Sequence, residues 1–214
     1  MQNFRSFLAR KGVTPSFRRY GVDALGAMAQ GLFCTLLVGT ILNTLGQQFG
    51  LSILTDPVVS AGGTSYTIGG LASAMVGPGI AVAIGAALLC PPLVLFSLIP
   101  VGFAANALAG AGGPLAVYLV TLLAAETGKI VSKETRIDIL VTPLTTILAG
   151  VALSCIIAAP IGAAAQSVGS LIMWATELAP FFMGMLVSAI IGVALGWLFR
   201  RMGLIKENDL KLDL

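Results

Sequence analysis

The chain has 214 residues, of which 57% are apolar and only 10% are charged, and its mean hydropathy is +0.98. Because a soluble domain carries roughly a quarter charged residues, this composition excludes a water-soluble fold and makes the lipid bilayer the main surrounding of the chain. The net charge of +3 does not indicate a nucleic acid partner, since the charges are confined to short segments that mark the water-facing ends of helices.

The first predicted span covers residues 22–45 and follows a basic arm, residues 1–21. The arm carries five bases, namely Arg5, Arg10, Lys11, Arg18 and Arg19. Between Ala24 and Ala125 the only charged residue is Asp56. Because positive residues stay on the cytoplasmic side, the arm is predicted to be cytoplasmic and Asp56 to lie outside. Asp23 at the start of this span is interpreted as a helix N-terminal acid.

Three further spans are predicted between Pro57 and Ala125, because the next charged segment, residues 126–138, contains the bases Lys129, Lys133 and Arg136 and is placed inside. Each span needs about 20 apolar residues. Helix breakers occur at Gly77-Pro78-Gly79, Cys90-Pro91-Pro92, Pro100 and Gly112-Gly113-Pro114, which is more than three spans require. Some of these segments are therefore expected to be broken or re-entrant helices.

Two more spans are predicted at residues 137–158 and 180–199, before a basic tail, residues 200–214. Trp197 with Arg200 and Arg201 is typical of an anchor at the membrane interface. The intervening residues 161–178 are expected to lie at the outer interface or to re-enter the membrane. The fold class is thus an all-α polytopic membrane protein with about six transmembrane helices over residues 22–199 and both termini cytoplasmic.

No catalytic constellation is expected in this chain. It has no histidine, which removes the commonest general base and any Ser-His or Cys-His nucleophile pair. The three cysteines, Cys34, Cys90 and Cys155, are isolated, so a zinc site is not expected, and no other metal or cofactor is indicated. A phosphate-binding Gly-Lys-Ser/Thr loop is absent too, which leaves a passive or partner-driven membrane function.

Small residues recur at every fourth position of several predicted helices. Such stripes allow close approach of helix backbones in a membrane and are interpreted as helix-packing faces. The faces are also expected to support a homodimer. The helix-packing candidates are Gly31 and Gly39 in the first span and Gly184, Ser188, Gly192 and Gly196 in the last.

Two places are candidate solute-binding sites. In the first, Thr142 and Pro143 are followed by Thr145. The proline frees a helix carbonyl beside hydroxyl groups, as in the broken helices of transporters. The alternative interpretation is a simple kink of the helix. In the second, Glu177 follows Trp174 between apolar stretches. Glu177 is a candidate solute or proton ligand if its segment re-enters the membrane, and a solvated carboxylate otherwise. Glu126 and Lys129 are expected to form a structural pair at a helix end.

Several segments together resemble one bacterial membrane family. They are Phe17-Arg-Arg-Tyr20-Gly-Val-Asp23, Pro91-Pro92-Leu-Val-Leu-Phe96, Glu126-Thr-Gly-Lys129, Asp138-Ile-Leu-Val-Thr142-Pro143 and Trp174-Ala-Thr-Glu177-Leu-Ala-Pro180. The chain resembles the EIIC-like family of the sugar phosphotransferase system, of the perfringolysin-regulator type, and looks like a shortened member of it. The resemblance implies a bacterial cell membrane, a sugar-like solute and a separate cytoplasmic subunit that performs phosphoryl transfer.

The functional hypothesis is the membrane-embedded component of an EIIC-like transporter, which binds and translocates a solute. Two alternatives are a membrane regulator or scaffold that does not transport, and an inactive remnant.

Overall fold

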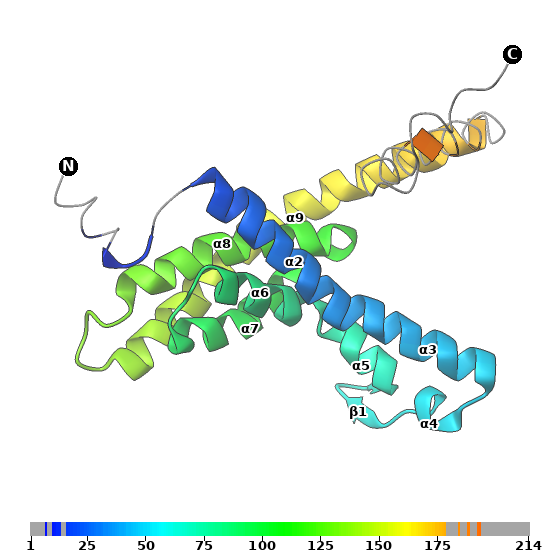
Figure 1. Cartoon of the computed structure of the whole chain (residues 1–214), viewed down its shortest axis with the longest axis horizontal. Helices are drawn as coiled ribbons and strands as arrows, with labels where there is room; N and C mark the ends of the chain where they lie inside the picture. The colour runs from blue at the N-terminus through cyan, green and yellow to red at the C-terminus, as the bar shows by residue number, and fades with distance from the viewer. Residues whose placement is uncertain are drawn as a thin grey trace, which may run out of the picture. The chain divides into compact units, whose positions relative to one another are not determined.

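The computed structural model describes residues 16–178 and, outside this range, residues 7, 10–13, 184, 188, 192 and 193. The chain divides into two compact units, Met1–Gln166 and Ser167–Leu214. The first unit is a helical bundle, and the helix labels below are those of Figure 1.

An uninterrupted helical stretch runs from Arg18 to Phe49. It consists of η1 (Arg18–Ala24), α2 (Leu25–Leu32), η2 (Phe33–Leu37) and α3 (Val38–Phe49), the two η segments being π-helical. The stretch ends at Gly50, which has φ +62°. This left-handed conformation is strained in residues with a side chain, so glycine is the usual residue after a helix C-terminus.

A small β-hairpin follows α4 (Ser52–Thr55), which the expected all-α fold does not include. Its strands β1 (Val59–Ala61) and β2 (Thr64–Tyr66) pair antiparallel, with Val59 opposite Tyr66. The two-residue turn consists of Gly62 and Gly63, both with positive φ, as the tight turns that favour hairpins require. The serine and threonine side chains of the hairpin, Ser60, Thr64 and Ser65, are exposed.

Next comes a bent helix pair, α5 (Ile68–Ala74) and α6 (Val76–Ala87), whose axes differ by 55°. The side chain of Thr67 begins α5 by accepting a hydrogen bond from the Gly70 N–H at 3.0 Å. The expectation of a broken helix in this region agrees with this bend. The break lies at Met75, just before the Gly77-Pro78-Gly79 segment that predicted it.

A helical hairpin follows, made of α7 (Pro92–Ala109), the short η3 (Gly110–Gly112) and α8 (Gly113–Val131). The chain reverses at Gly110, which has φ +53°. A Cβ added to Gly128 would lie 2.8 Å from a methyl group of Val94, so the two arms run antiparallel and close together. The hairpin limits coincide with the predicted breakers at Pro91-Pro92 and Gly112-Gly113-Pro114, whereas Pro100 lies inside α7.

The last described helix, α9, covers Asp138–Leu178 and contains Pro143 and Pro160. The sequence predicts a separate segment after residue 160, but a single helix extends over both parts. Proline is tolerated within membrane helices, where neighbouring groups satisfy the freed carbonyl. No charge between Asp138 and Glu177 marks a water-facing boundary.

Within the described residues, three apolar helical stretches are long enough to cross a membrane, or four if the bent pair counts as one span. They are Arg18–Phe49, Pro92–Val131 and Asp138–Trp174, the second of which is the hairpin of α7 and α8. The protein is therefore a helical membrane protein. Six spans with both termini cytoplasmic remain a prediction, because residues 180–199 lie almost entirely outside the described part of the chain.

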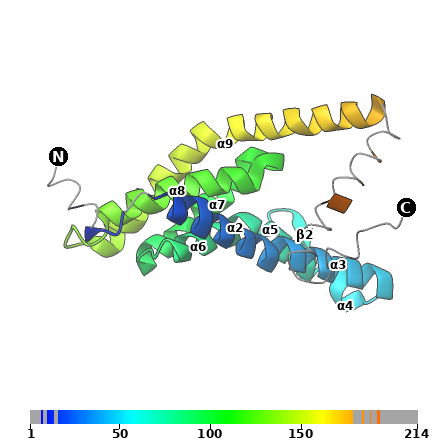
Figure 2. The same ribbon diagram turned by 45° about the horizontal axis from the view of Figure 1, so that its top comes forward.

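Helices α2, α6, α7 and α8 lie side by side in Figures 1 and 2 and enclose an aliphatic core. The core includes Ile80, Ile84, Leu98, Val117 and Val120, all fully buried. Many large apolar side chains on the outer surface are exposed, as expected for a surface that faces lipid.

Glycines bring these helices into backbone contact. A Cβ on Gly31 would lie 2.7 Å from the Ile80 Cα and 2.8 Å from the Gly79 carbonyl, so α2 and α6 touch there. Gly39 faces Gly69 and Ser73 of α5 in the same way. Both faces are thus covered by the chain itself, and neither is available to the homodimer that the sequence led us to expect.

We predict that Gly31→Ala lowers the stability of the bundle by about 1–3 kcal/mol, because the added methyl group would overlap backbone atoms that cannot rotate away. Thermal unfolding in mild detergent measures the loss. Gly26→Ala, also in α2, is the matched control, since its Cβ meets nothing within 4 Å. Alanine there should be neutral or slightly stabilising. Equal melting points for the two variants would contradict the close contact of α2 and α6.

Candidate functional site

One end of the bundle gathers most of the charged side chains that the structure describes. Three segments distant in sequence meet there: the basic arm, the turn between α6 and α7, and the turn between α8 and α9. Lys11 in the arm donates a 2.5 Å hydrogen bond to the carbonyl of Ser132, which lies 121 positions away. We call this region the charged end.

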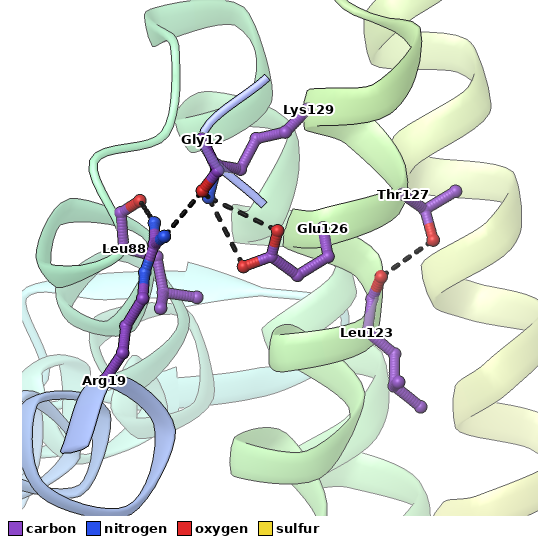
Figure 3. A network of polar contacts seen from close by, with 7 residues as sticks. All are labelled: Gly12, Arg19, Leu88, Leu123, Glu126, Thr127 and Lys129. Carbon is purple, nitrogen blue, oxygen red and sulfur yellow. Dashed lines mark hydrogen bonds and ion pairs between the residues drawn. The ribbon is translucent and has the colours of Figure 1, made fainter. Parts of the chain in front are cut away.

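A buried ion pair lies near the C-terminal end of α8 (Figure 3). The Lys129 ammonium is 3.3 Å from both carboxylate oxygens of Glu126 and donates to the Gly12 carbonyl at 3.1 Å. The exposed fraction of the side chain is 2% for Lys129 and 14% for Glu126. A side-chain hydrogen bond also joins Tyr20 to Glu126. The expected pairing of Glu126 with Lys129 is confirmed, and it links α8 to the arm and to η1.

Arg19 connects the arm to the end of α6 (Figure 3). Its guanidinium donates to the carbonyl oxygens of Gly12 and Leu88, each at 2.5 Å. Leu88 is the C-cap residue of α6, and carbonyls at a helix C-terminus lack intrahelical donors. A guanidinium presents several N–H groups in a fixed plane and can therefore bind two carbonyls at once.

A cavity of about 300 Å³ opens beside these contacts. Four cationic side chains and one carboxylate line it, together with a serine and a proline. Lys11 reaches the carboxylate of Glu134 at 2.5 Å. The lining residues are Arg10, Lys11, Pro91, Lys129, Ser132, Lys133 and Glu134.

The turn between α8 and α9 contributes Ser132, Lys133 and Glu134 to the lining of this cavity. Lys133 has φ +64°, and its backbone N–H donates to Asp138 at 2.7 Å. The hydroxyl of Ser132 is buried and has no hydrogen-bond partner. The excess of cationic over acidic side chains in the lining of the cavity suits the binding of an anion.

The cysteine near the charged end, Cys90, is a poor candidate for a nucleophile. Burial raises the pKa of the Cys90 thiol to about 11, although the nearby Lys129 acts in the opposite direction. Because the thiolate is the nucleophile, Cys90 is a weak one at neutral pH. Within the described residues, no group of three His, Cys, Asp or Glu side chains could hold a metal ion.

The candidate residues near Pro143 form hydrogen bonds within their own helix. Thr142 is fully buried and its hydroxyl donates to Asp138 at 2.5 Å. Thr145 donates to the carbonyls of Val141 and Thr142, at 2.8 and 3.1 Å. These contacts are the pattern of a proline-containing helix whose hydroxyls bond backward.

The other candidates lie in or beyond the last turns of α9. The side chain of Glu177 and all of Gly196 are outside the described part of the chain. Gly184 and Gly192 are exposed, and a Cβ on either would meet nothing within 4 Å. Ser188 donates to the Gly184 carbonyl at 2.7 Å.

Sequence reasoning missed most of the charged end. It interpreted Arg19 and Lys11 only as markers of the cytoplasmic side, and it assigned no role to Ser132. The density of bases in residues 10–19 and 129–136 was the available signal, but a local pattern does not show that the two segments meet.

The apolar helices define a membrane protein, and the family comparison gives its class. The family described as "Phosphotransferase system, EIIC" matches residues 22–197. The chain belongs to this family, and the resemblance found in the sequence is confirmed. Membership indicates a membrane component of phosphotransferase-system sugar transport. No curated protein and no solved structure matches the chain.

Proposed function

We propose that the chain binds a sugar-like solute within the membrane and carries it across, as part of an EIIC-type transporter in a bacterial cell membrane. The family match over residues 22–197 carries this proposal. Phosphoryl transfer would be performed by a separate cytoplasmic subunit, as membership of the phosphotransferase-system family implies.

The bundle has features that suit such a role. The bent pair α5 and α6 interrupts a span, and interrupted helices supply the polar backbone groups that bind solutes in transporters. At the other end of α5 from this bend, Thr67 donates to the Asn43 side chain at 2.9 Å, which brings polar groups of α3 and the start of α5 together. The proposed orientation places the charged end in the cytoplasm, in keeping with its bases.

Glu177 is the proposed solute ligand, and Thr142, Pro143 and Thr145 are proposed to contribute to binding. For the threonines this role requires that a solute replace bonds now made to the helix backbone. Glu177 is therefore the residue of choice for a first test.

We predict that a bound sugar, sugar acid or small organic anion raises the melting temperature of the detergent-purified protein and that Glu177→Gln abolishes the increase. A hundredfold excess of ligand over its dissociation constant stabilises a protein by about 2.7 kcal/mol. The matched control is Asp56→Asn, which removes an exposed carboxylate far along the chain. Uptake into proteoliposomes then separates transport from binding alone.

A ligand that stabilises both variants equally would exclude Glu177 but keep the proposed function. Cooperative unfolding with no stabilisation by any ligand, and no uptake above empty vesicles, would contradict it.

A further inference from the structure

Two departures from regular α-helix lie at the same level of the structure, one in each of two helices that pack together. The first is η2 (Phe33–Leu37), the π-helical segment between α2 and α3. The second is Met75, which has φ −89° and ψ 15°, outside the helical range, and where the axes of α5 and α6 differ by 55°. A Cβ on Gly79 would lie 2.6 Å from the methyl group of Thr35, so the middle of η2 faces a point about one turn from Met75.

The elements between these two points form one compact body, which we call the hairpin lobe: α3, α4, the strands β1 and β2, and α5. A Cβ on Gly39 would lie 2.6 Å from the Gly69 carbonyl oxygen, so α3 and α5 are in backbone contact. A Cβ on Gly46 would lie 2.9 Å from the Leu54 Cβ, so α4 packs just as closely on α3. Contacts at this distance leave the helices of the lobe little room to move against one another.

Beyond the two points, α2 and α6 are held in the bundle with α7 and α8. Gly31 brings α2 against α6, and Gly77 and Gly102 bring α6 against α7, because a Cβ on either would overlap the carbonyl of the other. In the described part of the chain, α3 and α5 pack against each other and against η2, and neither packs extensively against α7 or α8. Figures 1 and 2 show the lobe projecting from these helices. The lobe is thus joined to the bundle through η2 and Met75.

Both points are places where a helix bends easily. Kinks concentrate at prolines and at π-helical turns, where the regular hydrogen-bond ladder is incomplete. In a continuous helix through Met75, the Ala74 carbonyl would accept from residue 78, but Pro78 has no N–H to donate. In the other helix, the Thr35 hydroxyl donates to the Gly31 carbonyl at 2.7 Å, a backward bond that often bends helices.

We infer that the hairpin lobe pivots as one body on the bundle, with η2 and Met75 as a paired hinge. The pair is required, because a flexible point in one helix alone would be held by the intact helix packed beside it. A pivot of about 20° would move the far end of α3 by about 6 Å, since its 12 residues extend over about 18 Å. The pivot depends on the fold and not on transport, so its test uses neither a solute nor a transport measurement.

Pulsed electron paramagnetic resonance on the full chain in nanodiscs measures the motion as a distribution of distances between two spin labels. The labels are attached to a non-canonical amino acid, which leaves the native cysteines in place. One pair of labels replaces Ile53 in the lobe and Phe96 in the bundle, and the control pair replaces Phe96 and Leu115, both in the bundle; all three side chains are exposed. The lobe–bundle distribution should be wider than the bundle distribution by about 6 Å. Equal widths would overturn the inference.

Pro78→Ala distinguishes a hinge from a lobe that is loosely packed throughout. The substitution supplies an N–H for the Ala74 carbonyl, so that α5 and α6 can continue as one helix through Met75. The lobe–bundle distribution should then lose about half of its excess width, while the bundle distribution keeps its width. Pro160→Ala is the matched control, because Pro160 is an exposed proline inside α9 and outside the hinge. It should leave both distributions unchanged, and an equal response to the two substitutions would exclude Met75 as a hinge point.

Discussion

Glu126→Gln is expected to destabilise the protein by about 3–5 kcal/mol, the largest effect that we predict for a single substitution. The substitution removes the only acidic partner that the structure gives to Lys129, whose side chain is 2% exposed. The ammonium would then remain buried with the Gly12 carbonyl as its described partner. Removing one member of a buried pair is costly because the other charge stays away from water without compensation. Thermal unfolding in detergent measures the effect.

The double variant Glu126→Gln with Lys129→Met should recover much of this loss, because it removes the stranded charge along with its partner. Asp56→Asn is the control for the loss of a carboxylate as such, since Asp56 is exposed, and it should change stability by less than about 1 kcal/mol. If the double variant were as unstable as Glu126→Gln alone, the pair would have no coupling and the prediction would be wrong.

Local sequence features predicted much of the fold, because helix ends in a membrane carry strong signals. Proline and glycine marked the turns at Pro91-Pro92 and Gly112-Gly113-Pro114, and the scarcity of charge marked the apolar stretches. The prediction of a separate segment after residue 160 was wrong, because proline alone does not end a membrane helix. The β-hairpin was missed, although Gly62 and Gly63 are a typical turn signal, since the short segment around them has few apolar residues to reveal strand periodicity.

The small-residue faces at Gly31 and Gly39 pack against helices of the same chain. The spacing of Gly31 and Gly39 indicates close helix contact, and the structure supplies the contact from α6 and α5 of the same chain. A stripe of small residues specifies how near a helix can come but not which helix it is. The homodimer therefore has no support from these two residues.

The charged end could not be predicted, because it depends on contacts between distant parts of the sequence. Lys11 with Ser132, and Arg19 with Leu88, are separated by 121 and 69 positions. The sequence indicates that bases lie on one side of the membrane. It does not indicate that they converge on one cavity.

Arg19→Ala is expected to lower stability by about 3 kcal/mol and to release the arm from the end of α6. The guanidinium joins two carbonyls, of Gly12 and Leu88, and each hydrogen bond to a charged group contributes about 1.5–3 kcal/mol. Without Arg19 the Leu88 carbonyl at the end of α6 would lose this donor while it remains buried. Thermal unfolding measures the loss of stability, and hydrogen exchange of residues 10–13 measures the release of the arm.

Arg19→Lys tests the geometry, because lysine keeps the charge but has a single ammonium that cannot reproduce the planar fork. It should recover only part of the stability, whereas Arg18→Ala, at an exposed neighbouring base, should change it by less than about 0.5 kcal/mol. Full recovery by lysine would show that charge alone holds the arm. An unchanged exchange rate in Arg19→Ala would show that Lys11 and Lys129 hold it without Arg19, because both also connect the arm to α8 and the turn that follows it.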